Sequence, residues 1–180
     1  ERGLGERCIY MSGPSGPVMT DTLYNNNYQF VQTGRHFAIW VEMIHEMRIV
    51  RMDEKHRTDG VRPWGGDSIG WWEGDTLVVE TKYFTPSDRA RTSPLGDYLV
   101  SPRTVVTERF TRSDANTINY SVTIEDPKVY TKPWTVSLPL NRDDTYTMYE
   151  YSCQEGNYAM ANALSFGRKR DKEAAAASSR

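Results

Sequence analysis

Four residues whose side chains could move a proton or hold an anion lie close together in one short stretch. They are Glu42, His45, Glu46 and Arg48, at a predicted turn between two strands. Histidine is the side chain most readily poised for proton transfer near neutral pH, and a neighbouring carboxylate can orient its ring. The pattern predicts His45 as acid or base, Glu42 as its orienting partner and Arg48 as the holder of an anionic group. An ordinary surface ion pair explains the same residues about equally well.

Three further carboxylates are candidates for a second proton-transfer group. Glu80 follows the apolar run Leu77–Val79, and Glu108 sits in the middle of a predicted strand beside Arg109. Alternate residues of a barrel strand face inward, and a buried carboxyl has a raised pKa that suits an acid. An outward-facing glutamate paired with a basic residue on the next strand is the favoured alternative. Asp67 could act as a base at the barrel mouth or could be a turn residue.

Aromatic side chains could form a stacking wall for a ring-containing ligand. They make up 12% of the chain, a content that suits either a lined cavity or an aromatic-rich core. Trp71 and Trp72 are neighbours on a predicted strand, so their rings face opposite sides and one of them faces inward. The candidate substrate-binding residues are Trp40, Asp67, Trp71, Trp72 and Tyr151.

Several kinds of chemistry lack the pattern that they need. The histidines, His36, His45 and His56, do not have metal-ligand spacing, so no metal is expected. GxSxG, a phosphate loop, GxGxxG and CxxC are all missing, so no cofactor is expected and serine hydrolase, nucleotide-binding and redox roles are disfavoured. A net charge of −2 argues against nucleic acid as the main partner. No stretch approaches eighteen apolar residues, so no membrane-spanning helix is expected.

Cys8 and Cys153 are the two cysteines of the chain, one near its start and one at the end of a predicted strand. A disulfide between them would join the N-terminal segment to the last strand and would indicate an exported protein. Two buried free thiols in a cytoplasmic protein are the alternative. The chain begins with Glu1 rather than Met, which fits a trimmed chain or a removed signal peptide.

Alternating apolar residues and turn signals predict a chain made mostly of strands. The clearest case is a hairpin with strands Asp67–Trp72 and Thr76–Phe84, because Gly74 in its turn can adopt a positive φ. Two long loops, Glu54–Gly66 and Thr85–Pro102, have the length of functional lids. Further strands are predicted over Tyr28–Thr33, His36–Glu42, Glu46–Asp53, Thr104–Thr111, Asn116–Glu125, Trp134–Leu140 and Thr145–Cys153, and a helix near Asn157–Phe166.

Sequential hairpins predict an all-β fold, an antiparallel up-and-down barrel of about eight strands of the lipocalin or calycin kind, with a short C-terminal helix. A two-sheet sandwich is the second candidate. A single domain is expected over residues 1–170, with a disordered tail over residues 171–180. At this strand number a barrel interior can hold one small ligand.

Several motifs resemble a large uncharacterised family of exported bacterial β-rich proteins. They include Trp72–Thr81 (WEGDTLVVET), Tyr149–Tyr151 followed by Cys153, and Glu155–Tyr158 (EGNY). The resemblance implies secretion through a cleaved signal and pairing of the two cysteines, and it implies no particular reaction. Members of the family often have histidine where this chain has Trp71 and Gln154, so a site that uses those histidines would be altered here.

Two functional hypotheses follow. The first is a periplasmic or secreted enzyme that performs metal-independent acid–base chemistry, as a lyase, isomerase, cyclase or hydrolase, on a small hydrophobic or cyclic molecule in the barrel. The second is a lipocalin-like binder that holds such a molecule without turnover. An interior where His, Glu and Arg converge would favour catalysis, whereas an apolar interior would favour carriage. A side-chain-filled structural barrel and a homo-oligomer are open alternatives.

Overall fold

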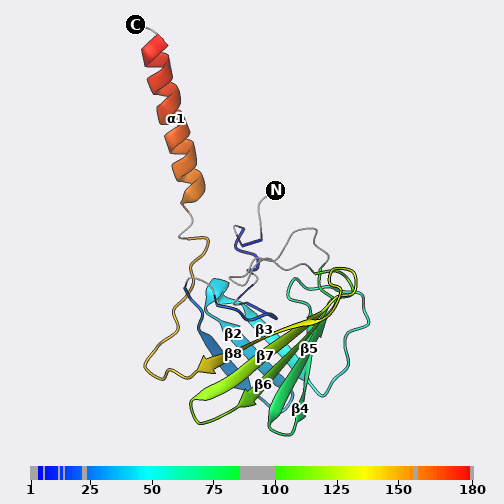
Figure 1. Cartoon of the computed structure of the whole chain (residues 1–180). Coiled ribbons are helices and arrows are strands. Elements are labelled where there is room, and N and C mark those ends of the chain that lie inside the picture. The colour runs from blue at the N-terminus through cyan, green and yellow to red at the C-terminus, as the bar shows by residue number, and fades with distance from the viewer. Residues whose placement is uncertain are drawn as a thin grey trace.

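The fold is one curled sheet of eight strands followed by a helix (Figure 1). The computed structural model describes residues 4–5, 7–11, 13, 15–21, 24–85, 100–155 and 158–178. The elements are β1 (Tyr28–Gln32), β2 (His36–Val41), the 3-10 turn η1 (Met43–His45), β3 (Met47–Met52), β4 (Asp67–Glu73), β5 (Thr76–Lys82), β6 (Val105–Arg112), β7 (Thr117–Glu125), β8 (Trp134–Asn141) and α1 (Ala159–Ser178).

The strands pair in the order in which they occur in the sequence, as in an up-and-down barrel. Every pairing is antiparallel except β3 with β4, where Arg51 and Met52 pair in parallel with Ile69 and Gly70 after the loop 53–66. β1 and β8 are the two ends of the sheet, so the prediction of a closed barrel is wrong and the sheet is a curled half-barrel. β8 contains Pro139, which cannot donate to a ladder and is typical of edge strands.

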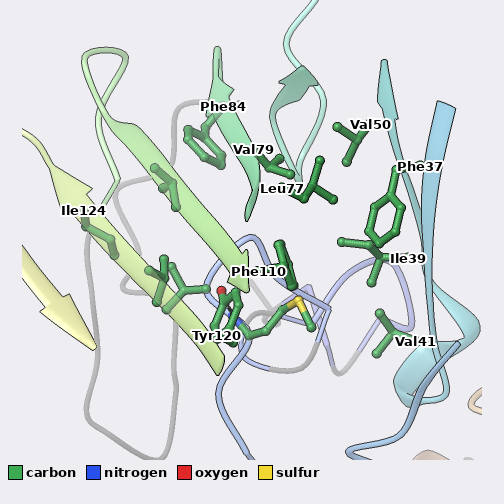
Figure 2. Packing of buried hydrophobic residues seen from close by; sticks show 14 of the residues in the cluster. Phe37, Ile39, Val41, Val50, Leu77, Val79, Phe84, Phe110, Tyr120 and Ile124 are labelled. Atoms are coloured by element: carbon green, nitrogen blue, oxygen red, sulfur yellow. Dashed lines mark hydrogen bonds between the residues drawn. The ribbon is translucent and has the colours of Figure 1, made fainter. Parts of the chain in front are cut away.

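The concave face of the sheet carries the hydrophobic core (Figure 2). Buried and less buried residues alternate along β2, β3, β6 and β7, as expected for strands with one face in the core. The curl brings the rings of Phe30 and Phe37, from the first two strands, to 5.8 and 6.2 Å from the ring of Phe110 on β6. The two halves of the sheet therefore pack directly against each other.

A segment of the N-terminal lead-in, residues 15–20, fills one end of the curl, and we call it the N-terminal plug. All six of its residues are buried, and Val18 and Met19 belong to the core cluster. The phenolic oxygen of Tyr120 accepts from the Met19 N–H at 3.0 Å and lies 3.1 Å from the Pro17 carbonyl oxygen. The plug packs against a side chain about a hundred residues away, so local sequence patterns do not predict its position.

A disulfide between Cys8 and Cys153 joins the N-terminal segment to the segment that follows β8, across a sequence separation of 145 residues. Such bonds are typical of proteins from oxidising compartments. The predicted strand Thr145–Cys153 is wrong, because residues 145–152 form no ladder and run as an irregular segment over the end of the sheet. Side-chain contacts take the place of a ladder there: Tyr146 donates to Glu42 at 2.8 Å.

The C-terminal helix is longer than predicted. α1 has 20 residues and continues to Ser178, through the segment expected to be disordered, and Figure 1 shows it extending away from the sheet. Asn157, where the predicted helix begins, lies outside the described residues, as does most of the predicted loop Thr85–Pro102. No helix in the described part of the chain combines the length and apolar character that crossing a membrane requires.

We predict that replacing both cysteines by serine destabilises the fold without changing its topology. By chain entropy, a cross-link over 145 residues contributes about 4–5 kcal/mol, and measured effects are often smaller. Urea unfolding of the Cys8→Ser/Cys153→Ser variant should show a loss of at least about 2 kcal/mol relative to the oxidised wild type. The reduced wild-type protein is the matched control and should behave like the variant; an unchanged midpoint would contradict the prediction.

Candidate functional site

The first predicted cluster does not assemble. The chain turns a sharp corner at η1. Glu42 directly precedes this turn and His45 is its last residue, whereas Arg48 points into the core from β3. Ile44 and His45 have φ values of 55° and 43°, a left-handed backbone conformation that is rare for residues other than glycine. This sharp corner directs the three side chains to different partners.

Glu42 holds the irregular segment 145–152 onto the corner. Its carboxylate accepts from the Asn27 amide at 2.6 Å and from the Tyr146 hydroxyl at 2.8 Å. Burial opposes its ionisation, but the hydrogen bonds from Asn27, Tyr146 and the Tyr149 N–H outweigh burial, so the pKa of Glu42 lies below its usual value. Glu42 is 1% exposed, and its contacts show a structural role in holding the segment 145–152 against the corner.

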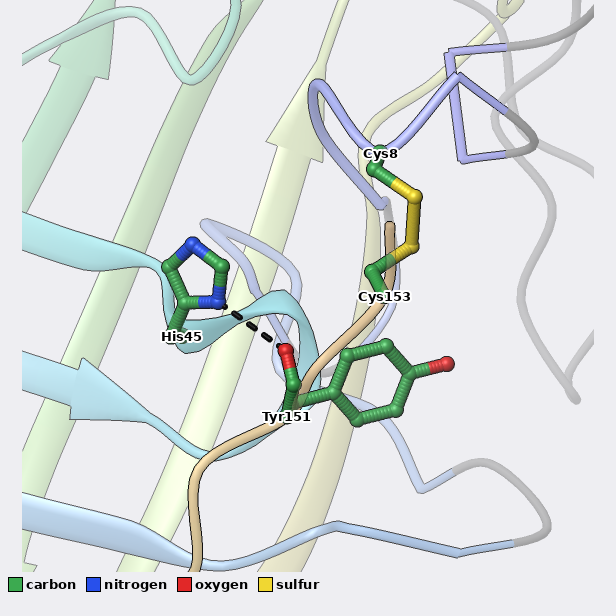
Figure 3. Close-up of a disulfide and its surroundings, with 4 residues drawn as sticks. All are labelled: Cys8, His45, Tyr151 and Cys153. Atoms are coloured by element: carbon green, nitrogen blue, oxygen red, sulfur yellow. Dashed lines mark hydrogen bonds between the residues drawn. A yellow bond between two sulfur atoms is a disulfide. The ribbon is translucent and has the colours of Figure 1, made fainter. Parts of the chain in front are cut away.

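His45 faces the same C-terminal segment from the other side. Its Nδ1 lies 3.1 Å from the carbonyl oxygen of Tyr151, two residues before the disulfide (Figure 3). The Tyr151 ring is half-buried against the core. Glu46 is a charged residue that interacts with His45. Burial raises the pKa of Glu46, and the charge of His45 acts in the opposite direction. Neither Glu42 nor Arg48 orients the imidazole.

Arg48 and Glu108 form an ion pair inside the core. The guanidinium contacts both carboxylate oxygens of Glu108, with Nη2–Oε1 at 2.9 Å, and Tyr120 donates to Oε1 at 2.9 Å. Glu108 is fully buried and Arg48 is 7% exposed. Burial raises the pKa of the Glu108 carboxyl, while Arg48 and Tyr120 act in the opposite direction. These groups bind one another and the plug, although the Nε of Arg48 is buried without a hydrogen-bond partner.

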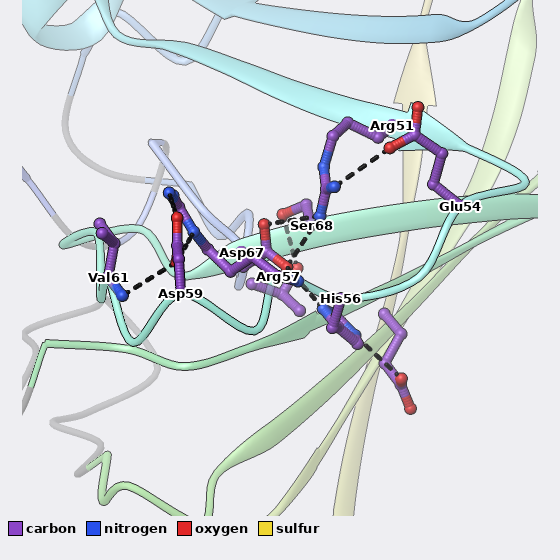
Figure 4. Close-up of polar contacts among 10 residues, drawn as sticks. Arg51, Glu54, His56, Arg57, Asp59, Val61, Asp67 and Ser68 are labelled. Atoms are coloured by element: carbon purple, nitrogen blue, oxygen red, sulfur yellow. Dashed lines mark hydrogen bonds and ion pairs between the residues drawn. The ribbon is translucent and has the colours of Figure 1, made fainter.

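Asp67 and Glu80, in contrast, do come together around His56. Figure 4 shows His56 beside Asp67. Asp67 pairs with Lys82 and Ile69 with Glu80 across β4 and β5, so the two carboxylates are diagonal neighbours on one face. His56 Nδ1 lies 2.8 Å from Asp67 Oδ2, and Nε2 lies 3.1 Å from Glu80 Oε1. His56 was not among the predicted site residues.

Further donors complete this cluster, which we call the His56 clamp and define as His56, Asp67 and Glu80. Arg51 Nη2 reaches both Asp67 oxygens at 2.9 and 3.0 Å, and the backbone N–H of Arg57 donates to Oδ2 at 3.0 Å. Lys82 Nζ donates to Glu80 at 2.6 Å. Both contacts of the imidazole are hydrogen bonds only when both ring nitrogens carry hydrogen. The clamp thus fastens the loop 53–66 onto β4 and β5.

The clamp leaves both of its carboxyl groups more acidic than usual. Burial alone would raise the pKa of Asp67, but the hydrogen bonds from Arg57 and His56 and the charge of Arg51 lower it below its usual value. Glu80 behaves in the same way, with Lys82 and His56 outweighing burial. Both groups are carboxylates at neutral pH, so neither has the raised pKa expected of a general acid.

A depression of about 220 Å³ lies beside the clamp, and its walls come mainly from the loop that the clamp holds. The edge of the His56 ring packs against Tyr83, with the ring centroids 5.6 Å apart. Tyr83 has a φ of 59°, a strained conformation for an aromatic residue of the kind that clusters at functional sites. The lining residues are Arg57, Thr58, Gly60, Val61, Arg62 and Tyr83.

The candidate stacking residues lie elsewhere. Trp40 is half-buried and alternates with the buried Ile39 and Val41, so it faces away from the core. Trp71 is half-buried and donates from Nε1 to Glu73 at 3.0 Å, and Trp72 is 47% exposed near the end of β4. Neither forms part of the depression. No group of three or more His, Cys, Asp or Glu side chains in the described ranges is arranged to hold a metal ion.

No protein-family model, no curated protein and no solved structure matches this chain. The similarity of its motifs to exported bacterial proteins therefore stays a prediction. The site has to be interpreted from its own geometry.

We predict that Glu108→Gln destabilises the protein by about 3–5 kcal/mol, because it leaves the buried Arg48 charge without its partner. The double variant Arg48→Met/Glu108→Leu removes both charges and should lose less than the sum of Glu108→Leu and Arg48→Met. Urea unfolding of all four variants gives the coupling. A Glu108→Gln variant within about 0.5 kcal/mol of wild type would contradict the internal ion pair.

We also predict that Asp67→Asn destabilises the protein by about 1–3 kcal/mol at pH 7, because the ionised carboxylate holds Arg51, His56 and the Arg57 N–H. The pKa of Asp67 is lower in the folded than in the unfolded protein, so its stabilisation is complete above about pH 4 and is lost as pH falls further. Thermal unfolding at pH 7 and pH 3 should show a smaller difference between variant and wild type at pH 3. Asp144→Asn, at an exposed aspartate, is the control; a difference independent of pH would overturn the assignment.

Proposed function

We propose that this protein is an exported, non-catalytic binding protein that takes a small cyclic molecule in the depression between residues 57–62 and Tyr83. The observation that carries the proposal is the depression itself, whose walls combine aromatic, aliphatic and cationic side chains. Small-molecule sites commonly combine an apolar wall with a few placed polar groups. The disulfide supports an exported location.

The described interior of the sheet offers less support for a ligand. The N-terminal plug fills one end of the curl, and Phe30, Phe37 and Phe110 meet across the middle. The charged groups on the inner wall, Arg48 and Glu108, are bound to each other. A ligand between the two halves of the sheet would have to displace these contacts, whereas the depression is already formed.

Binding is favoured over catalysis because the candidate proton-transfer groups are engaged by the protein. Glu42 is bound by Asn27 and Tyr146, and His45 faces a backbone carbonyl. In the clamp, each nitrogen of His56 has a carboxylate partner. A general acid or base must be within hydrogen-bond reach of its substrate, and such reach here requires an existing contact to break.

Acid–base catalysis at the clamp is the second candidate, and one observation favours it. The clamp adjoins the depression, since His56 packs on Tyr83 and precedes Arg57 in the chain. A substrate that displaces Glu80 from Nε2 would meet an imidazole oriented by Asp67, which is a known catalytic arrangement. The two candidates differ in whether the bound molecule is recovered unchanged.

We predict that native mass spectrometry of the oxidised protein, purified from the exported fraction, detects a bound small molecule that denaturing extraction recovers. Thr58→Trp should lower its occupancy about tenfold, because the indole fills the depression. Thr131→Trp, at an exposed threonine between β7 and β8, is the matched control and should retain the ligand.

Incubation of the recovered molecule with fresh protein separates the two candidates. An unchanged compound supports binding, and a product that forms with wild type but not with His56→Gln supports catalysis. Equal occupancy in wild type and Thr58→Trp would place the ligand elsewhere and overturn the proposal.

A further inference from the structure

We propose that the depression selects a small, singly charged anion with a ring-shaped body, such as an aromatic or cyclic carboxylate, and that Arg62 binds its carboxylate. This inference rests on the binding role proposed above and names the ligand class for the same site.

The charge of the depression comes from two arginines with different surroundings. Arg57 is neutralised by Asp59, with Nε–Oδ1 at 2.8 Å and Nη2–Oδ2 at 2.6 Å. Arg62 is exposed, and within the described ranges no ion pair joins it to a carboxylate. Its guanidinium carbon lies 5.5 Å from the centroid of the Tyr83 ring. The depression therefore carries one positive charge without a carboxylate partner.

Contact with Tyr83 suits Arg62 to bind a carboxylate. An aromatic ring attracts the guanidinium through its face, and such a contact leaves the in-plane N–H groups free to donate. Two parallel N–H donors match the geometry of a carboxylate. The Tyr83 ring also meets the His56 ring in an edge-to-face arrangement, so Tyr83 and Arg62 are both positioned before a ligand arrives.

The volume of the depression and the Arg57–Asp59 ion pair restrict the class of ligand further. About 220 Å³ lies below the range of roughly 300–1,000 Å³ typical of sites for drug-sized molecules, so a single ring with one substituent is the expected scale. Hydrogen bonds from Arg57 hold the pKa of Asp59 at about 2, so this carboxylate keeps its negative charge beside the depression. Because Arg57 and Asp59 neutralise each other, the depression has one positive charge left for a ligand, which favours a monoanion over a dianion.

Three probes that share one ring and differ in charge test the inference: benzoate, benzamide and benzamidine. Titrations of the full oxidised chain, followed by the backbone ¹H–¹⁵N signals of Gly60 and Val61, report affinity and location together. Benzoate should bind at least about tenfold more tightly than benzamide, as expected for charge-assisted hydrogen bonds, and benzamidine should bind least. Raising the salt concentration should weaken benzoate selectively, because the site is exposed.

Two alanine variants assign the preference to a residue. Arg62→Ala should reduce benzoate affinity to that of benzamide, whereas Arg103→Ala, at another exposed arginine, should leave the preference intact. Equal binding of benzoate and benzamide to wild type, or a preference retained in Arg62→Ala, overturns the inference. If both compounds bind equally and Thr58→Trp blocks both, the binding role stands and only the anion selectivity fails. If no probe binds below about 10 mM, both proposals fail.

Discussion

A buried ion pair between Arg48 and Glu108 lies inside the core of the curled sheet. It links β3 to β6 through the core, and Tyr120 connects it from β7 to the backbone of the plug. Isolated charges are costly in an apolar interior, so these groups are tolerated only while each meets its partners. A slip of one residue along β6 would turn Glu108 to the convex face. The pair therefore specifies both the strand register and the seat of the plug.

This internal network determines where a ligand can be accommodated. Because the plug and the facing aromatic rings occupy the curl, the inner wall is a packed core in the part of the chain that the structure describes. At the end of the curl that the plug occupies, the plug itself covers the inner wall. In the described residues, a formed concavity lies instead between the loop 53–66 and Tyr83. A curled half-barrel sheet thus accompanies a proposed binding site outside its core.

The His56 clamp and the contacts of Tyr83 both fasten the loop 53–66. The His56 clamp anchors the loop at one point, and Tyr83, directly after β5, meets both His56 and Arg62. Ordering a loop of this length costs conformational entropy that charged hydrogen bonds offset. A loop fastened in this way presents Arg62 in one arrangement, so less ordering remains to be done when a ligand binds. The stability of the loop and the proposed recognition of a ligand depend on the same few contacts.

The sequence by itself determined the strands, because side-chain alternation and turn residues act over a few positions. Eight strand predictions, from Tyr28–Thr33 to Trp134–Leu140, match β1–β8 to within one or two residues at most ends, and Cys8 and Cys153 pair as expected. Only the tertiary structure decided that the barrel stays open and that residues 145–152 form side-chain contacts instead of a strand. The tertiary structure also decided which residues form the His56 clamp. Asp67 and Glu80 share a face that hairpin register makes foreseeable, but their partner His56 arrives from a long loop whose path local patterns do not encode. Alternation predicts which side of a strand a residue faces, whereas contacts between distant segments depend on how the whole chain packs.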